Sequence, residues 1–273
     1  MFYEPSTRTS CSFQAAAFKL GCNVINLTEK MSSVEKGESL EDTIQTLGFY
    51  GDAIVLRHPS KGSAERAAAV SRVPIINAGD GNGEHPTQAL LDIYTIYTEL
   101  RSRGIDLDSS ERDTITITFV GDLKNGRTVH SLIRALLHFP NLRFVYVSPG
   151  SLEMPDEIVS LVSHTNRYEQ NKRTSLEEAI RTTDVLYMTR IQKERFVSGS
   201  DTVDYCRLTR DNLQFAKEKM IIMHPLPRLD EISPDVDSDS RAVYFKQVEN
   251  GLYVRMAILD RIFKRQSVPI IPS

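Results

Sequence analysis

The residues near the start of the chain with the clearest chemical potential are Ser6-Thr7-Arg8-Thr9. Apolar residues at helical spacing follow them, so a helix is expected to begin near Ser6. The free N–H groups at a helix start, together with the positive end of the helix dipole, can hold a phosphate, and Arg8 would strengthen such a site. The alternative is that Ser6 and Thr9 are ordinary helix caps and Arg8 is a solvated charge. A phosphate site here therefore requires further cations from elsewhere in the chain.

Arginines also follow several apolar runs that have the composition of buried strands. They are Arg57, Arg127, Arg190 and Arg228. His85-Pro-Thr-Gln88 follows another such run. Because ligands of parallel α/β sheets bind beyond the carboxyl ends of the strands, chemistry is expected at these positions. Taken one at a time, Arg57 could instead pair with a carboxylate, His85 could be a turn histidine, and Arg190 could belong with Gln192 to a surface charge run.

The elements that must position these residues alternate between strand and helix. Strands are expected at residues 22–27, 53–56, 73–77, 114–120, 142–147, 184–188, 220–223 and 243–245. Helices are expected from residue 6, at 40–50 and 64–70, from residue 86, after residue 126, and at 176–180, 208–217 and 251–263. This rhythm predicts an α/β protein of two doubly wound parallel-sheet domains. We place the first at residues 1–100 with the closing helix 251–263, and the second at 113–250.

Composition excludes several classes of function. The chain has 273 residues, 40% of them hydrophobic, and a net charge of -3 from 33 basic and 36 acidic residues. This balance predicts neither nucleic-acid nor membrane partners. The three cysteines, Cys11, Cys22 and Cys206, are widely spaced, which favours a reducing compartment and argues against a structural zinc. A cytoplasmic location is therefore expected.

Longer motifs give the chain a family resemblance. Residues 6–9, 85–88, 121–131, 187–196 and 224–228 resemble motifs of the carbamoyltransferase family, in particular its aspartate-specific branch. The amino-acid sequences of several of these motifs are also similar to the corresponding domain of the eukaryotic multienzyme polypeptide that begins pyrimidine synthesis. The resemblance implies transfer of a carbamoyl group from carbamoyl phosphate to the α-amino group of L-aspartate. It also implies fusion to, or association with, carbamoyl phosphate synthetase and dihydroorotase.

The resemblance further implies roles for individual residues. Carbamoyl phosphate would be bound by Ser6, Thr7, Arg8, Thr9, Arg57, His85, Gln88, Pro225 and Leu226, with Thr9, Arg57 and His85 catalytic. Aspartate would be bound by Arg127, Thr128, Arg190 and Gln192. Guanidinium forks suit the two carboxylates of aspartate, and fixed cations suit a phosphate leaving group. No metal and no cofactor are expected, because an uncharged amine can attack the carbonyl carbon directly.

The loop at residues 32–38 is expected to reach the active site of a neighbouring subunit. In the family this arrangement goes with a homotrimer whose sites are shared, and we assign the contacts to Ser33 and Lys36, with Ser32 as the alternative serine. Relative to the family pattern, the first domain is expected to be N-terminally truncated, which would make this polypeptide less stable and lower its activity. The rival functions are an ornithine carbamoyltransferase-like enzyme and a truncated, non-catalytic homologue.

Overall fold

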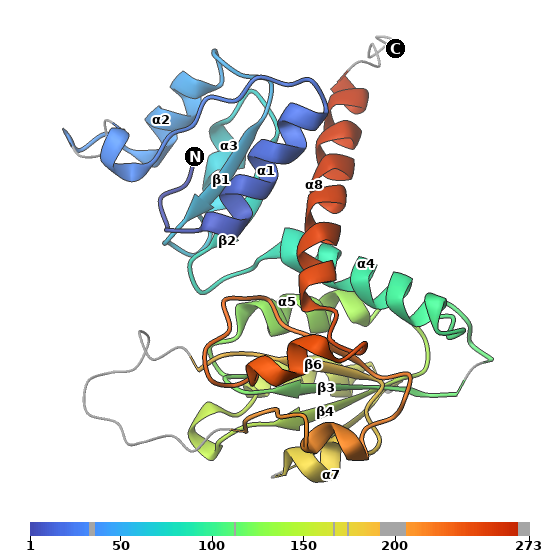
Figure 1. Cartoon of the computed structure of the whole chain (residues 1–273). Helices are drawn as coiled ribbons and strands as arrows, with labels where there is room; N and C mark the ends of the chain where they lie inside the picture. The colour runs from blue at the N-terminus through green and yellow to red at the C-terminus, as the bar shows by residue number, and fades with distance from the viewer. Residues whose placement is uncertain (33–35, 112, 166, 174, 192–205, 267–273) are drawn as a thin grey trace. The chain divides into compact units, whose positions relative to one another are not determined.

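The computed structural model describes residues 1–32, 36–111, 113–165, 167–173, 175–191 and 206–266. The chain forms two compact units. Unit 1 is Met1–Leu91 with Val248–Ser273, and unit 2 is Asp92–Gln247. The division falls inside helix α4 (Pro86–Ser102) and near the start of helix α8 (Tyr244–Gln266) (Figure 1). Within the described part of the chain, no helix is long and apolar enough to span a bilayer.

Unit 1 is built on two parallel strands, β1 (Ile54–His58) and β2 (Ile75–Asp80). Its other elements are α1 (Thr7–Lys19), η1 (Glu29–Met31), α2 (Leu40–Leu47), α3 (Ser63–Val70), the start of α4 and most of α8. The apolar stripe predicted on the first helix is buried, since Phe13 and Ala16 of α1 pack in one cluster with Ile76 of β2 and Leu259 of α8. This packing fixes α1, and hence the loop before it, against the sheet.

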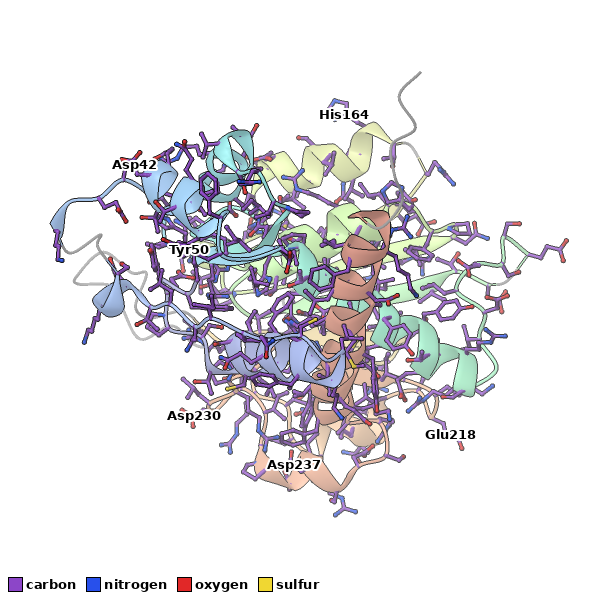
Figure 2. The ribbon with its side chains drawn as sticks, turned by 90° about the horizontal axis from the view of Figure 1, so that it is seen from above. Asp42, Tyr50, His164, Glu218, Asp230 and Asp237 are labelled. Atoms are coloured by element: carbon purple, nitrogen blue, oxygen red, sulfur yellow. The ribbon has the colours of Figure 1, made fainter. Side chains whose placement is uncertain are left out.

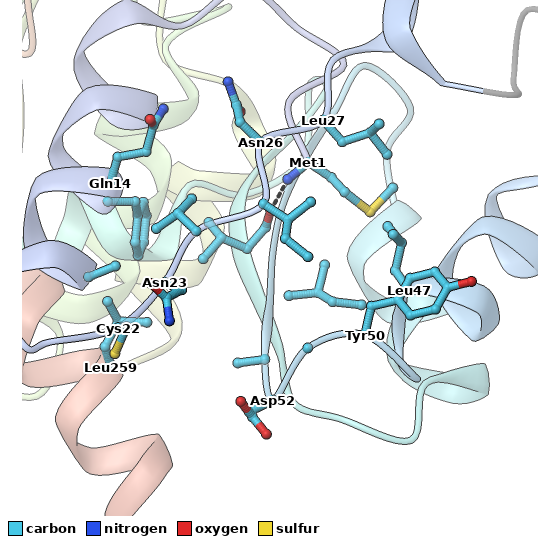
Figure 3. Close-up of a pocket in the computed structure, with 18 of the residues that line it drawn as sticks. Met1, Gln14, Cys22, Asn23, Asn26, Leu27, Leu47, Tyr50, Asp52 and Leu259 are labelled. Atoms are coloured by element: carbon cyan, nitrogen blue, oxygen red, sulfur yellow. Dashed lines mark hydrogen bonds between the residues drawn. The ribbon is translucent and has the colours of Figure 1, made fainter.

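The predicted strand at residues 22–27 is not a strand in the structure. A strand needs a ladder partner, and the contacts of this segment with residues 1–3 are confined to its end, at Leu27 and Thr28. Phe2 forms parallel bridges to Thr28 and to Arg57, and the Met1 amine donates to the carbonyl oxygen of Val55 at 2.9 Å. A cavity of about 650 Å³ lies beside β1 and residues 21–27 (Figure 3). Residues 22–27 therefore run without a hydrogen-bonded neighbour along most of their length.

Unit 2 contains a five-stranded parallel sheet in the order β5-β4-β3-β6-β7. The strands are β3 (Ile115–Val120), β4 (Leu142–Val147), β5 (Glu169–Arg173), β6 (Val185–Met188) and β7 (Ile221–Met223). The helices are α5 (Arg127–Leu136), α6 (Asp156–His164) and α7 (Leu176–Ile180), with η3 (Gly150–Leu152), η5 (Asn212–Phe215) and η6 (Pro234–Ser238) in the connections. Buried clusters flank both faces of the sheet. The predicted fold class, two parallel-sheet α/β domains, is confirmed.

Further segments differ from prediction, among them helix α6, which was not expected. The segment 169–173 is an edge strand that the sequence did not indicate, because its residues are polar and largely exposed. Residues 243–245 were predicted as a strand, but α8 starts there and only an isolated bridge joins Ala242 to Ile222. Residues 208–217 form only the short η5 rather than an α-helix. Short apolar runs at element ends are compatible with either state, so tertiary contacts decide between them.

Candidate active site

In unit 1 the structure brings Arg57 and His85 together. Arg57 Nη1 lies 3.4 Å from His85 Nε2 and donates to the carbonyl oxygen of Ala78 at 3.2 Å. Both side chains are buried, with 9% and 4% of their surface exposed. A guanidinium can only donate, so the contact requires His85 Nε2 to be an unprotonated acceptor. A neutral histidine beside a fixed cation is suited to polarise a substrate carbonyl.

The loop between β2 and α4 holds His85 in place. Asp80 Oδ1 accepts from the Glu84 backbone N–H at 2.7 Å, and Asp80 Oδ2 accepts from Gly62 N–H at 2.9 Å. Gly81 has φ +56°, and a Cβ there would lie 2.1 Å from the carbonyl oxygen of Pro59. His85 then accepts the first backbone hydrogen bonds of α4 and therefore caps that helix. Asp80 is a positioning residue that the sequence analysis missed, although aspartate followed by glycine is a recognisable turn signal.

The start of α1 carries the predicted phosphate-binding residues. Ser6 occupies the N-cap position, yet its side chain accepts no capping hydrogen bond from the helix, so the simple capping interpretation does not account for it. Arg8 and Thr7 are exposed, and Thr9 is buried. The first-turn N–H groups lack a partner inside the helix by geometry, which leaves them suited to an anion.

Glu4 is a second residue that the sequence analysis did not identify. Its Oε2 atom lies 2.8 Å from Arg57 Nη2, so a carboxylate does pair with this arginine, as the alternative interpretation allowed. The pair links the segment before α1 to the end of β1. Because Arg57 also contacts His85, the ion pair orients the guanidinium and does not remove it from the candidate site.

In unit 2 the predicted residues come from three neighbouring strand ends. Strand β3 lies between β4 and β6, and β6 pairs with β7. Arg127, buried, starts the helix that follows β3. Arg190 follows β6 and is half-buried, and Pro225 with Leu226 follow β7. Since the strands are parallel, all these residues lie at the carboxyl ends of the strands, on the same side of the sheet. Thr128, half-buried, follows Arg127 in α5.

The loops after β3 and β6 touch through their backbones. Gly121, the first residue after β3, has φ +115°. A Cβ at this position would lie 2.2 Å from the carbonyl oxygen of Thr189, the residue before Arg190. Thr189 Oγ1 also donates to the carbonyl oxygen of Val120 at 3.0 Å. This close approach fixes the loop carrying Arg190 relative to the loop leading to Arg127.

Arg228, the remaining strand-end arginine, has structural partners. Its Nη2 donates to Asp237 Oδ2 at 2.5 Å, and its Nη1 donates to Asp237 and to Tyr244 (Asp237 is labelled in Figure 2). The hydrogen bond from Arg228 holds the pKa of Asp237 below its usual value, with burial opposing the shift. Arg228 therefore belongs to an ion pair and not to the set of candidate ligand-binding arginines.

The remaining predicted site residues are Ser33, Lys36, Gln88 and Gln192. Ser33 and Gln192 lie outside the described residues. Lys36 is exposed, and Gln88, in the first turn of α4, is buried. Within the described ranges, no group of three or more His, Cys, Asp or Glu side chains could hold a metal ion. The cavity of Figure 3 is lined by none of the predicted site residues.

Family models match both halves of the chain. Residues 1–98 match the aspartate/ornithine carbamoyltransferase, carbamoyl-P binding domain. Residues 113–262 match the Asp/Orn binding domain of the same enzymes. The candidate site residues of unit 1, such as Arg57 and His85, therefore lie in the first match. The strand-end arginines of unit 2 lie in the second.

Individual relatives resemble the chain over most of its length. Multifunctional protein pyr1-3 of Dictyostelium discoideum is 53% identical over 266 residues, which are 96% of this chain but 12% of that protein. The aspartate carbamoyltransferase catalytic subunit of Clostridium perfringens is 48% identical over 96% of this chain and 84% of its own length. A crystal structure of Trypanosoma cruzi aspartate transcarbamoylase with aspartate and phosphate matches with a TM-score of 0.84 and 45% identity, covering 95% of this chain and 79% of that one. The chain thus spans about an eighth of the multifunctional relative.

Proposed function

Because this chain belongs to the aspartate/ornithine carbamoyltransferase family, we propose that it transfers the carbamoyl group of carbamoyl phosphate to the α-amino group of L-aspartate. The products are N-carbamoyl-L-aspartate and phosphate, and the reaction serves pyrimidine synthesis. The observation that carries the proposal is the buried contact between Arg57 and His85, within the domain that matches the carbamoyl-P binding model.

The donor site is assigned to unit 1. Arg8 and the first turn of α1 bind the phosphate, since the guanidinium supplies positive charge and the helix start supplies N–H donors at the positive end of the helix dipole. Attack on the carbonyl carbon places negative charge on its oxygen, which Arg57, His85 and Thr9 stabilise. The new C–N bond forms as the C–O bond to phosphate breaks, and the amine proton passes to the departing phosphate. Gln88 binds the carbamoyl NH2 group.

The acceptor site is assigned to unit 2. Aspartate has two carboxylates, and Arg127 and Arg190 each offer a guanidinium from neighbouring strand ends. Two planar forks bind two carboxylates bidentately, which a lysine cannot do. Thr128 and Gln192 assist, and the carbonyl groups of Pro225 and Leu226 accept from the carbamoyl NH2 group.

Aspartate is favoured over ornithine as the acceptor. An ornithine site needs a carboxylate or a thiolate facing the side-chain ammonium, and Pro225 stands after His224 where a cysteine would serve. A non-catalytic homologue is the less favoured alternative, because all the residues expected to bind the substrates are present in the sequence.

The assembly proposed is a homotrimer in which Ser33 and Lys36 of one subunit contribute to the site of the next. Fusion to, or association with, carbamoyl phosphate synthetase and dihydroorotase is proposed from the multifunctional relative. A cytoplasmic location is proposed from the odd number and wide spacing of Cys11, Cys22 and Cys206.

The test is product formation from carbamoyl phosphate with aspartate and, separately, with ornithine. We expect N-carbamoyl-L-aspartate with aspartate and no citrulline with ornithine. A bisubstrate mimic that joins a phosphonate to aspartate should inhibit competitively with carbamoyl phosphate. Citrulline formation, or no product with either amino acid, would overturn the proposal.

A further inference from the structure

The turn after β7 contains a buried polar cluster outside the set of predicted site residues. The Leu226 backbone N–H donates to His224 Nδ1 at 2.8 Å. His224 Nε2 lies 2.7 Å from Glu231 Oε1, and both carboxylate oxygens of Glu231 accept from the Leu229 backbone N–H at 3.1–3.2 Å. The side chains of His224 and Glu231 are only 1% and 5% exposed. One histidine–carboxylate pair thus binds two backbone groups of the same turn.

These contacts define the state of the imidazole. Nδ1 accepts from a backbone N–H, so it carries no proton, and Nε2 must then be the nitrogen that donates to Glu231. Burial raises the pKa of Glu231, but the hydrogen bonds from His224 and from the backbone N–H groups lower it by more, so its pKa lies below the usual value. A carboxylate at this position therefore favours the tautomer that binds Leu226.

A second set of contacts ties the same histidine to the rest of unit 2. The His224 backbone N–H donates to Gln247 Oε1 at 3.0 Å, and Gln247 Nε2 donates to Asp92 Oδ1 at 2.6 Å. Asp92 Oδ2 accepts from the Tyr187 hydroxyl at 2.7 Å. Burial and the adjacent charge of Asp92 hold the pKa of Tyr187 well above its usual value, so it remains a donor. His224 is therefore fixed at its backbone as well as at its ring.

The geometry points to His224 and Glu231 as positioning residues for recognition of the carbamoyl group, an inference that rests on the proposed function. The peptide bond between Pro225 and Leu226 is trans, since the cis bond of this turn is Leu226–Pro227. In a trans peptide the carbonyl oxygen points away from the N–H of the same plane. Holding the Leu226 N–H on the imidazole therefore directs the Pro225 carbonyl away from His224, where it can accept from the carbamoyl NH2 group.

The experiment compares two replacements of His224 in the full chain. His224→Leu removes the acceptor for the Leu226 N–H, whereas His224→Asn keeps an oxygen that can accept from an N–H two residues later. Glu231→Gln removes the negative charge that favours the His224 tautomer with the proton on Nε2. It provides the test if His224→Leu does not fold. For each variant the KM for carbamoyl phosphate is compared with the inhibition constant of inorganic phosphate, which lacks the NH2 group.

We expect the ratio of KM to the phosphate inhibition constant to rise about tenfold in His224→Leu and by at least about threefold in Glu231→Gln, in proportion to hydrogen bonds lost or weakened. In His224→Asn the ratio should stay within about threefold of the unsubstituted chain. An unchanged ratio in folded His224→Leu or Glu231→Gln would overturn the inference. An equal rise of the ratio in His224→Asn and in His224→Leu would also overturn it. Absence of carbamoylaspartate formation by the unsubstituted chain overturns the proposed function itself, and this inference with it.

Discussion

The loops after β3 and β6 approach each other closely in unit 2. We therefore expect Gly121→Ala to lower both the free energy of unfolding and kcat/KM for aspartate. The added Cβ would lie 2.2 Å from the carbonyl oxygen of Thr189 and 2.6 Å from its Oγ1. Ordinary van der Waals contact begins at 3.4 Å, so the two backbones must separate by about 1.2 Å. Thr189 directly precedes Arg190, and the displacement therefore reaches a guanidinium assigned to aspartate.

The magnitude follows from strain and from misplacement. A side chain at positive φ costs about 1–2 kcal/mol, and an overpacked contact costs about 1–3 kcal/mol more. Gly121→Ala should therefore lower the free energy of unfolding by about 2–5 kcal/mol. A shift of about 1 Å in a substrate-positioning group can cost about a hundredfold in rate, so kcat/KM for aspartate should fall by one to two orders of magnitude.

Gly104→Ala is the matched control. Gly104 also lies in unit 2 and has φ +77°, but a Cβ there meets nothing within 4 Å. It carries the conformational cost of about 1–2 kcal/mol without the collision. Steady-state kinetics of carbamoylaspartate formation and urea unfolding measure both variants. Equal kcat/KM for aspartate in Gly121→Ala and Gly104→Ala would refute the argument that the contact with Thr189 positions Arg190.

Substitutions at three other residues test separate parts of the protein. Arg190→Ala should raise the KM for aspartate at least about tenfold with an unchanged phosphate inhibition constant, and Arg190→Lys should not restore it; an unchanged aspartate saturation curve would remove Arg190 from the acceptor site. His85→Ala should lower kcat by about a hundredfold while the dissociation constant of carbamoyl phosphate changes much less, as shown by turnover beside equilibrium binding. The folded-state pKa of Glu231 is lowered, so its stabilising contribution is present above the unfolded-state pKa and is lost as pH falls through the folded value. Unfolding free energies of the unsubstituted chain and Glu231→Gln should therefore differ at pH 7 and converge in acid, and a difference that grows as pH falls would contradict the sign.

Patterns of buried apolar residues predicted most of the architecture. The stripe on α5 and the Val- and Ile-rich strands β3, β4 and β6 repeat with the period of their element and are buried as expected. The polar edge strand β5 carries no such pattern, because it is exposed along most of its length. Residues 22–27 carry the pattern without the strand, because strand formation depends on a partner and not on composition alone.

Site residues can be predicted where the local sequence pattern places them, and cannot be predicted where their role depends on a partner distant in the sequence. Arg57, Arg127 and Arg190 stand at or just after strand-like runs, so their positions can be predicted from parallel topology. Glu4 could not be assigned to Arg57, since several carboxylates were equally plausible partners before the fold was known. Its identity depends on the bridge that places Phe2 beside Arg57.

Residues that act through other residues could not be predicted from the sequence, because their partners lie far away along the chain. Asp92 is 155 positions from Gln247 and 95 from Tyr187, and only the folded core brings the three together. A polar side chain buried completely must satisfy its hydrogen-bonding groups, so each such residue constrains where its partners lie. His224 was recognised as part of a motif, but its role in the turn depends on Glu231, which satisfies the other ring nitrogen. A binding residue can be predicted from its type and its place at a strand end, whereas a positioning residue is identified by the atom that it holds.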